Sequence, residues 1–212
     1  MLQFRDIPRQ VWIPTFRLFQ RIPMRGWLKF LLIIIVLPIL VGGIVLFVAG
    51  RPVAFEILQR RIATRFPEVK WISTQDLGRW QDDTGQPQPL ILDARTQPEF
   101  AVSHLREAVL IDPYKPSMRA LRGSRPSESI VVYSSAGYRG ARVTAWLNRA
   151  GYTSVVNLSG GLFKWADEGR PMVRDENRPT PLVHPYDRRW GLLVDGRHRA
   201  EAPEVEKRSA GP

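Results

Sequence analysis

The stretch Ile130-Val131-Val132-Tyr133-Ser134-Ser135-Ala136-Gly137-Tyr138-Arg139 decides the fold. Its first four residues form an unbroken apolar run, which is typical of a strand covered on both faces. Helical spacing begins directly after Gly137 and continues to Gly151, a residue type that commonly ends helices. The stretch therefore predicts a buried strand, a tight loop and a helix, in that order.

The loop at residues 134–139 is predicted to bind an anion. A strand-loop-helix turn directs several backbone N–H groups, and the positive end of the helix dipole, at one point. Arg139 adds a fixed positive charge at the edge of this point. The predicted anion-binding residues are Ser134, Ser135, Ala136, Gly137, Tyr138 and Arg139.

Composition limits the chemistry and the partners. The chain has 212 residues, a net charge of +11 and no cysteine, which excludes disulfides, thiolate metal sites and thiol catalysis. Residues 1–29 carry six Lys and Arg against one acid, whereas residues 69–170 carry thirteen against ten. Because the excess lies beside an apolar segment, it favours a lipid bilayer as partner over nucleic acid.

Residues 30–50 form that apolar segment, with no charged side chain over 21 positions. At about 1.5 Å per residue, a helix of this length spans roughly 30 Å, the thickness of a bilayer core. We therefore expect a single-pass transmembrane helix at 30–50, followed by a juxtamembrane helix or linker at 51–68. Residues 1–29 are interpreted as a basic amphipathic tail, with a disordered basic tail as the alternative.

Basic residues do not decide which side of the membrane the C-terminal part occupies. Four arginines or lysines lie within about 15 residues of each end of the apolar segment. Counting the whole N-terminal tail slightly favours a cytoplasmic N-terminus. The side of the soluble domain therefore stays open.

Residues 69–171 alternate between strand and helix patterns, which predicts an α/β fold with a parallel sheet and helices on both faces. Asp93 and Arg95 follow a predicted strand, at the sheet edge where sites of such folds form. Residues 172–212 are rich in proline and in charges of both signs, so a mostly extended or disordered tail is expected. Within this tail, only residues 190–194 are apolar enough to pack against the preceding domain. The expected strands are 69–72, 90–93, 108–111, 130–133 and 154–158.

Several motifs in order make residues 69–171 resemble the rhodanese-like family of sulfurtransferases. The apolar strand ending in Asp93-Ala94-Arg95 is similar to the family's first signature, and Glu99-Phe100 and His104-Leu105 to its next elements. The loop at 134–139 matches the family's active-site pattern Cys-x-x-Gly-x-Arg, with Ser134 at the cysteine position. Residues 158–162 resemble the closing motif. The resemblance implies sulfur transfer through a persulfide on that cysteine.

Serine at position 134 changes this chemistry. A serine hydroxyl is a weak nucleophile without a general base, and it cannot form a persulfide. His104 is the nearest candidate base in the sequence. The first hypothesis is therefore a membrane-tethered, catalytically inactive module that binds a small anion, a persulfidated partner or a protein segment. The alternatives are an active sulfurtransferase or serine-based transferase or hydrolase, and a structural adaptor in a membrane complex.

The remaining residues near the loop have expected supporting roles. Asp93 and Arg95 are interpreted as a structural pair that orients loops, and His104 as a structural histidine. Gly160 and Gly161 are expected to allow close packing beside the loop. Arg139 either locks the loop through an ion pair or contacts an anion. No metal ligand spacing is present, and no cofactor is expected.

Overall fold

The computed structural model describes residues 24–201, without the side chains of residues 24–28, 44–49 and 176. The chain divides between residues 49 and 50 into two units, which are described separately. Most of the predicted amphipathic tail at 1–29 lies outside the described residues.

Helix α1 (Met24–Arg65) provides the described part of the first unit. Its large apolar side chains from Phe30 to Val41 are exposed, by 39–68% of their surface. Within the described part of the chain, no helix meets the combined length and hydropathy that a membrane span requires. The span predicted at 30–50 includes residues 44–49, whose side chains lie outside the described residues.

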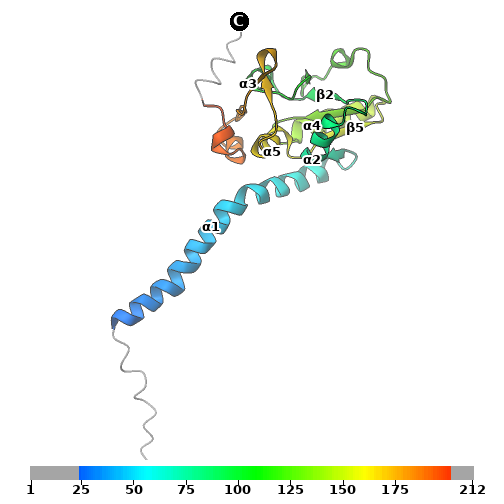
Figure 1. Ribbon diagram of the computed structural model, residues 1–212. Coiled ribbons are helices and arrows are strands. Elements are labelled where there is room, and N and C mark those ends of the chain that lie inside the picture. The colour runs from blue at the N-terminus through cyan, green and yellow to red at the C-terminus, as the bar shows by residue number, and fades with distance from the viewer. Residues whose placement is uncertain (1–23, 202–212) are drawn as a thin grey trace, which may run out of the picture. The chain divides into compact units, whose positions relative to one another are not determined.

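The second unit is built on a parallel sheet of five strands in the order β1-β5-β4-β2-β3 (Figure 1). All four neighbouring pairs are parallel, so the predicted α/β fold with a parallel sheet is confirmed. β4, the strand of the deciding stretch, lies at the centre and is buried throughout. The strands are β1 (Lys70–Ile72), β2 (Leu90–Asp93), β3 (Val109–Leu110), β4 (Ile130–Tyr133) and β5 (Val155–Leu158).

Side chains alternate between two cores, one on each face of the sheet. Ile91 and Val131 belong to a cluster with helices α2 and α5, whereas Leu92 and Val132 belong to a cluster with helix α4. This alternation follows from the two-residue period of a strand and explains why the strands read as continuous apolar runs. The helices are α2 (Thr74–Asp82), α3 (Gln97–Val102), α4 (Tyr138–Arg149) and α5 (Gly161–Asp167), with a 3₁₀ turn η1 (Met118–Leu121).

Residues 50–65 of α1 belong to this folded unit. Ile62 is 2% exposed and packs with Val69 and with the α4 residues Ala141 and Ala145. The segment at 51–68, which the sequence assigned to a juxtamembrane helix or linker, is therefore helical as far as Arg65 and contributes to the core of the domain.

The prediction of a mostly extended or disordered tail after residue 171 is not what the structure shows for residues 172–201. This segment contains an antiparallel hairpin and three 3₁₀ turns. Val173 exchanges two backbone hydrogen bonds with His104, at 2.7 and 2.9 Å, which attaches the hairpin to the domain. The elements are β6 (Val173–Arg174), η2 (Asp175–Asn177), β7 (Arg178–Pro179), η3 (Trp190–Leu193) and η4 (Gly196–His198).

The last part of this segment, residues 183–200, is called the C-terminal strap below. Val183 and Val194 are buried in the same core as α2 and α5. The Val183 N–H donates a hydrogen bond to the His198 carbonyl, and the Ala200 N–H donates to the Val183 carbonyl. The two ends of the strap therefore meet. Prolines and charges lower the mean hydropathy of this segment, but a few well-spaced apolar residues are enough to dock it.

Candidate functional site

The loop at residues 134–139 follows the central strand at the carboxyl edge of the sheet. Gly137 caps helix α4 in the left-handed conformation, with φ of 99°, which a glycine adopts without strain. The side-chain amide of Asn157, from β5, donates to the Gly137 carbonyl at 2.8 Å. The neighbouring strand therefore holds the turn at the point where the chain enters α4.

Gly161 packs against this loop, whereas the space beside Gly160 is filled by the Lys164 side chain. Both have positive φ, and a Cβ at Gly161 would collide with the carbonyl oxygens of Ser134 and Ser135. Without that Cβ, the N–H groups of Leu162 and Phe163 donate to these two carbonyls, at 2.8 and 2.9 Å. Helix α5 thereby fixes the backbone of the loop from one side.

Ser134 lies at the head of the loop and is 1% exposed. Its Oγ accepts a hydrogen bond from the Gly137 N–H at 3.2 Å. Among the described residues, no histidine or carboxylate accepts the Ser134 hydroxyl proton. His104 instead stacks on Phe100 at 3.9 Å and contacts the Phe100 carbonyl through Nδ1 at 3.0 Å. His104, which follows α3, is thus a structural residue and not a base for Ser134.

Arg139 is bound to a buried carboxylate that the sequence analysis did not connect with it. Its Nη1 and Nη2 donate to the two oxygens of Glu99, at 2.8 and 2.6 Å. Ser135 Oγ also donates to Glu99, at 2.7 Å, and accepts from Arg139. Glu99 is held in turn by the capping box that starts α3 at Thr96. The ion pair therefore ties both ends of the loop to α3.

The charge on Glu99 depends on these partners. Burial by itself would raise the pKa of Glu99, but the Arg139 guanidinium, with Arg95 and the Thr96 hydroxyl, outweighs it and lowers the pKa to about 2. Glu99 is therefore ionised at neutral pH, and it neutralises most of the charge that Arg139 would offer to a ligand.

Asp93 and Arg95 form a second buried ion pair beside the loop. Arg95 Nε and Nη2 donate to the two oxygens of Asp93, at 2.9 and 2.6 Å, and Nη2 also bonds the Ser103 carbonyl. The Tyr133 hydroxyl donates to Asp93 as well, and burial, followed by the charge of Asp93, raises the pKa of Tyr133. Because all three groups are almost fully buried, the pair holds strand ends together and does not face a ligand.

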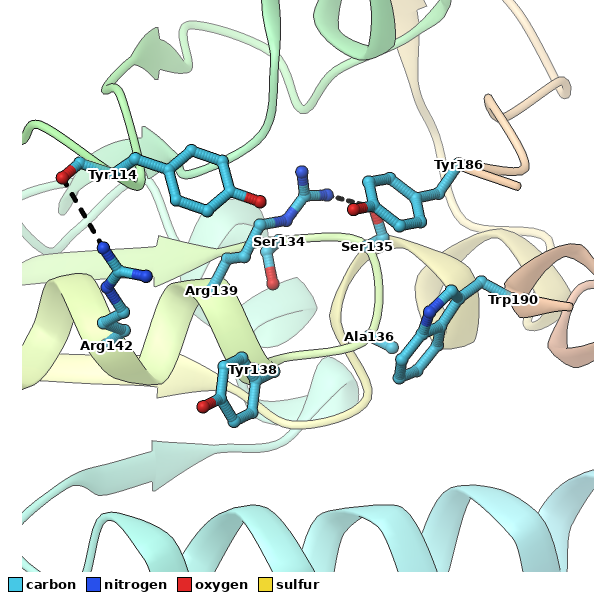
Figure 2. Close-up of a pocket in the computed structure, with 9 residues that line it drawn as sticks. All are labelled: Tyr114, Ser134, Ser135, Ala136, Tyr138, Arg139, Arg142, Tyr186 and Trp190. Carbon is cyan, nitrogen blue, oxygen red and sulfur yellow. Dashed lines mark hydrogen bonds between the residues drawn. The ribbon is translucent and has the colours of Figure 1, made fainter.

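Above the loop lies a cavity of about 290 Å³ (Figure 2). Four of its nine lining residues are aromatic, and the first three loop residues also line it. Four lining residues were not predicted from the sequence. Two of them come from the strap, one from the segment after β3 and one from α4. The lining residues are Tyr114, Ser134, Ser135, Ala136, Tyr138, Arg139, Arg142, Tyr186 and Trp190.

Arg142 is the missed residue that the sequence could have revealed. It follows Tyr138 by four positions and Arg139 by three, so helical spacing places all three on one face of α4. Its guanidinium lies over the Tyr114 ring, 5.2 Å from the centroid, and Nη2 donates to the Tyr114 carbonyl at 3.5 Å. Within the described part of the chain, no carboxylate lies within ion-pair distance of Arg142.

Tyr186 and Trp190 are placed by the fold of the strap. Arg139 Cζ lies 4.8 Å from the centroid of the Tyr186 ring. The Tyr186 N–H donates to Nδ1 of His184 at 2.9 Å, and burial lowers the pKa of His184. No local sequence pattern indicates that residues so far along the chain return to the loop.

Comparison with known proteins identifies relatives of the domain. The family model described as "Rhodanese-like domain" matches residues 73–168. A sulfurtransferase of Allochromatium vinosum is 30% identical over 108 residues, which are 51% of this chain and 98% of that protein. The mitochondrial protein HIGH ARSENIC CONTENT 1 of Arabidopsis thaliana is 37% identical over 37% of this chain and 53% of its own length.

More distant matches extend over part of larger proteins or over single domains. A tRNA uridine(34) hydroxylase of Escherichia coli is 25% identical over 59% of this chain, which spans 36% of that enzyme. A solved rhodanese-like domain protein from Staphylococcus aureus is 26% identical and covers 51% of this chain and 100% of its own, with a TM-score of 0.43.

The ion pair at Glu99 generates a prediction about acid stability. Replacing Glu99 with glutamine removes the charge and leaves Arg139 without a carboxylate. Since one pKa unit corresponds to about 1.4 kcal/mol, lowering the pKa from 4.5 to about 2 stabilises the fold by roughly 3 kcal/mol at neutral pH. This contribution is complete above pH 4.5 and is lost as the pH falls towards 2. Urea unfolding of the wild type and Glu99→Gln from pH 7 to 2.5 measures it.

The expected result is a stability difference that is large at pH 7 and shrinks below pH 4.5. Glu56→Gln is the matched control, because Glu56 is an exposed residue of α1 paired with Arg60. A Glu99→Gln variant as stable as the wild type at pH 7 would show that the ion pair does not hold the loop.

Proposed function

The chain belongs to the rhodanese-like domain family, and we propose that it is a membrane-tethered member that binds an anion at the loop without transferring sulfur. The observation that carries this proposal is Ser134 at the cysteine position. It lies under a cavity, and no base for its hydroxyl is found in the part of the chain that the structure describes. The bound group is a small anion or an anionic group on a partner, of which a persulfide is one example.

The absence of sulfur transfer follows from the chemistry of the nucleophile. Transfer requires a thiolate that attacks a sulfane sulfur and holds it as a persulfide. An alcohol at Ser134 needs a general base to become nucleophilic. Glu99 accepts from Ser135 and not from Ser134, and Arg139 keeps the pKa of Glu99 low, which makes Glu99 a poor base. These facts also disfavour a serine-based transferase or hydrolase.

Anion binding is supported by the charge around the cavity. No carboxylate lines it, and Arg142 brings a guanidinium to its rim. The first N–H groups of α4 have no partner within the helix and point towards the loop. The Arg139 guanidinium is already paired with the Glu99 carboxylate. We therefore assign the contact with the anion to Arg142 and to the loop backbone.

Membrane attachment is supported by the uncharged run at 30–50 and by the exposure of its described apolar side chains. Eleven large apolar side chains between Phe30 and Val41 are exposed in the described part of α1. Leaving such a surface in water is unfavourable by about 25 cal/mol per Å², so we propose that lipid covers it.

The sulfur-transfer test compares the wild type with Ser134→Cys in an assay with thiosulfate and cyanide. The wild type should show no turnover above background, whereas Ser134→Cys should gain at least roughly tenfold, because the loop would then carry a thiolate. Ser117→Cys, an exposed position away from the cavity, controls for adventitious thiols. Turnover by the unaltered chain would overturn the proposal.

The anion test follows the melting temperature of the full chain as sulfate is added at constant ionic strength. A ligand that binds only the folded state raises this temperature, and sulfate at tens of millimolar should raise it by about 2–4 °C. Arg142→Gln should reduce the shift, whereas Arg149→Gln, at the other end of α4, should keep it. An equal response of all three proteins would show that the effect is not at this site.

The membrane test isolates membranes from cells that produce the full chain and washes them at alkaline pH to extract proteins that are not embedded in lipid. At alkaline pH the protein should remain in the membrane pellet, as expected for a segment buried in hydrocarbon. A chain truncated to residues 51–212 is the comparison, and it should appear in the soluble fraction. Release of the full chain into the supernatant would exclude a transmembrane anchor.

A further inference from the structure

The cavity above the loop has a wall that a site for a small inorganic anion would not need. Tyr114, Tyr138, Tyr186 and Trp190 present aromatic rings to it (Figure 2). Such flat apolar surfaces contribute most to binding when the ligand also has a flat apolar part, because two rings can then stack. We propose that the ligand is an organic anion whose charged group is carried on an aromatic ring. This inference rests on the proposed function and narrows its ligand class.

The size of the cavity agrees with this class. An engineered cavity of about 150 Å³ is large enough to bind benzene. The cavity here has a volume of about 290 Å³, which accommodates a ring together with a sulfonate-sized or carboxylate-sized group.

The charges around the cavity orient the ligand. Of the two guanidinium groups that line the cavity, Arg142 has no carboxylate within ion-pair distance among the described residues, whereas Arg139 is paired with Glu99. The Ser134 Oγ accepts from Gly137, and its hydroxyl proton has no acceptor in the described structure. The anionic group therefore lies between Ser134 and Arg142, with the ring towards the strap.

The strap is built to keep its rings in this place. Tyr186 has φ of 66°, a left-handed conformation that is unfavourable for a residue with a side chain. Asp187 Oδ1 accepts from the N–H groups of Arg189 and Trp190, at 2.8 and 2.9 Å. These contacts hold the chain in a tight turn and bring both Tyr186 and Trp190 over the loop.

The test uses isothermal titration of the full-length chain in phosphatidylcholine nanodiscs, with empty nanodiscs as the blank. Three probe ligands separate the contribution of the aromatic ring to binding from the contribution of the negative charge. Benzenesulfonate has both, methanesulfonate has the charged group without the ring, and benzenesulfonamide has the ring without the charge. Benzenesulfonate should bind at least about tenfold more tightly than either of the other two, a difference of ~1.4 kcal/mol.

Variants place the effect at the strap. Tyr186→Ala should lower the ratio of benzenesulfonate to methanesulfonate affinity at least about threefold, since one of the rings that contacts the ligand is lost. Leu192→Ala is the matched control, because Leu192 lies on the same strap, is 66% exposed and does not line the cavity. Tyr114→Ala provides a second variant outside the strap, in case Tyr186→Ala does not fold.

The outcomes distinguish this inference from the proposed function. Equal binding of methanesulfonate and benzenesulfonate overturns the aromatic class and leaves anion binding intact. Equal binding of benzenesulfonamide and benzenesulfonate overturns the orientation by charge. If none of the probes and no sulfate binds, both the inference and the anion-binding function fail.

Discussion

The site depends on one buried carboxylate. Glu99 is 1% exposed, and an ionised group at that depth is tolerated only when it is paired and hydrogen-bonded. It therefore draws Arg139 and Ser135 towards α3 and sets the conformation of the loop between them. The same pairing removes Arg139 from the set of groups free to meet a ligand. A single electrostatic requirement thus shapes the loop. It is also the reason why the proposed function assigns the anion contact to Arg142, one helical turn along α4.

The two buried ion pairs at the carboxyl edge of the sheet have different consequences. Asp93 also accepts from Tyr133, and Arg95 also donates to a backbone carbonyl, so the pair is directed inwards and joins the end of β2 to β4. Glu99 and Arg139 join two elements across the mouth of the loop, and Arg139 still reaches the cavity surface. Buried ion pairs contribute little net stability compared with apolar packing of equal volume. Their value here is that they fix positions, which apolar contacts specify less sharply.

Much of the fold could be predicted from the sequence, because its signals are local. The strands are short apolar runs, the loop is marked by Gly137, and the helix after it has a clear period. The close approach of Gly161 to the loop also agrees with its residue type, whereas Gly160 faces Lys164 and not the loop. The partner of Arg139 was missed although Glu99 was part of a recognised motif, since no spacing rule links residues 40 positions apart. Arg142, by contrast, could have been predicted, because its spacing of four residues from Tyr138 places both on one face of the helix.

The strap shows where such reasoning fails and what that means for the site. Its mean composition resembles a disordered tail, yet Val183 and Val194 dock it in the core of α2 and α5. Arg51 in the folded unit also bonds Asp195 at 2.9 Å, but this pair is partly exposed, and exposed pairs contribute only about 0–1 kcal/mol. Burial therefore provides most of the docking energy. Since Tyr186 and Trp190 line the cavity only while the strap is docked, any ligand that contacts them must also stabilise docking, by thermodynamic linkage.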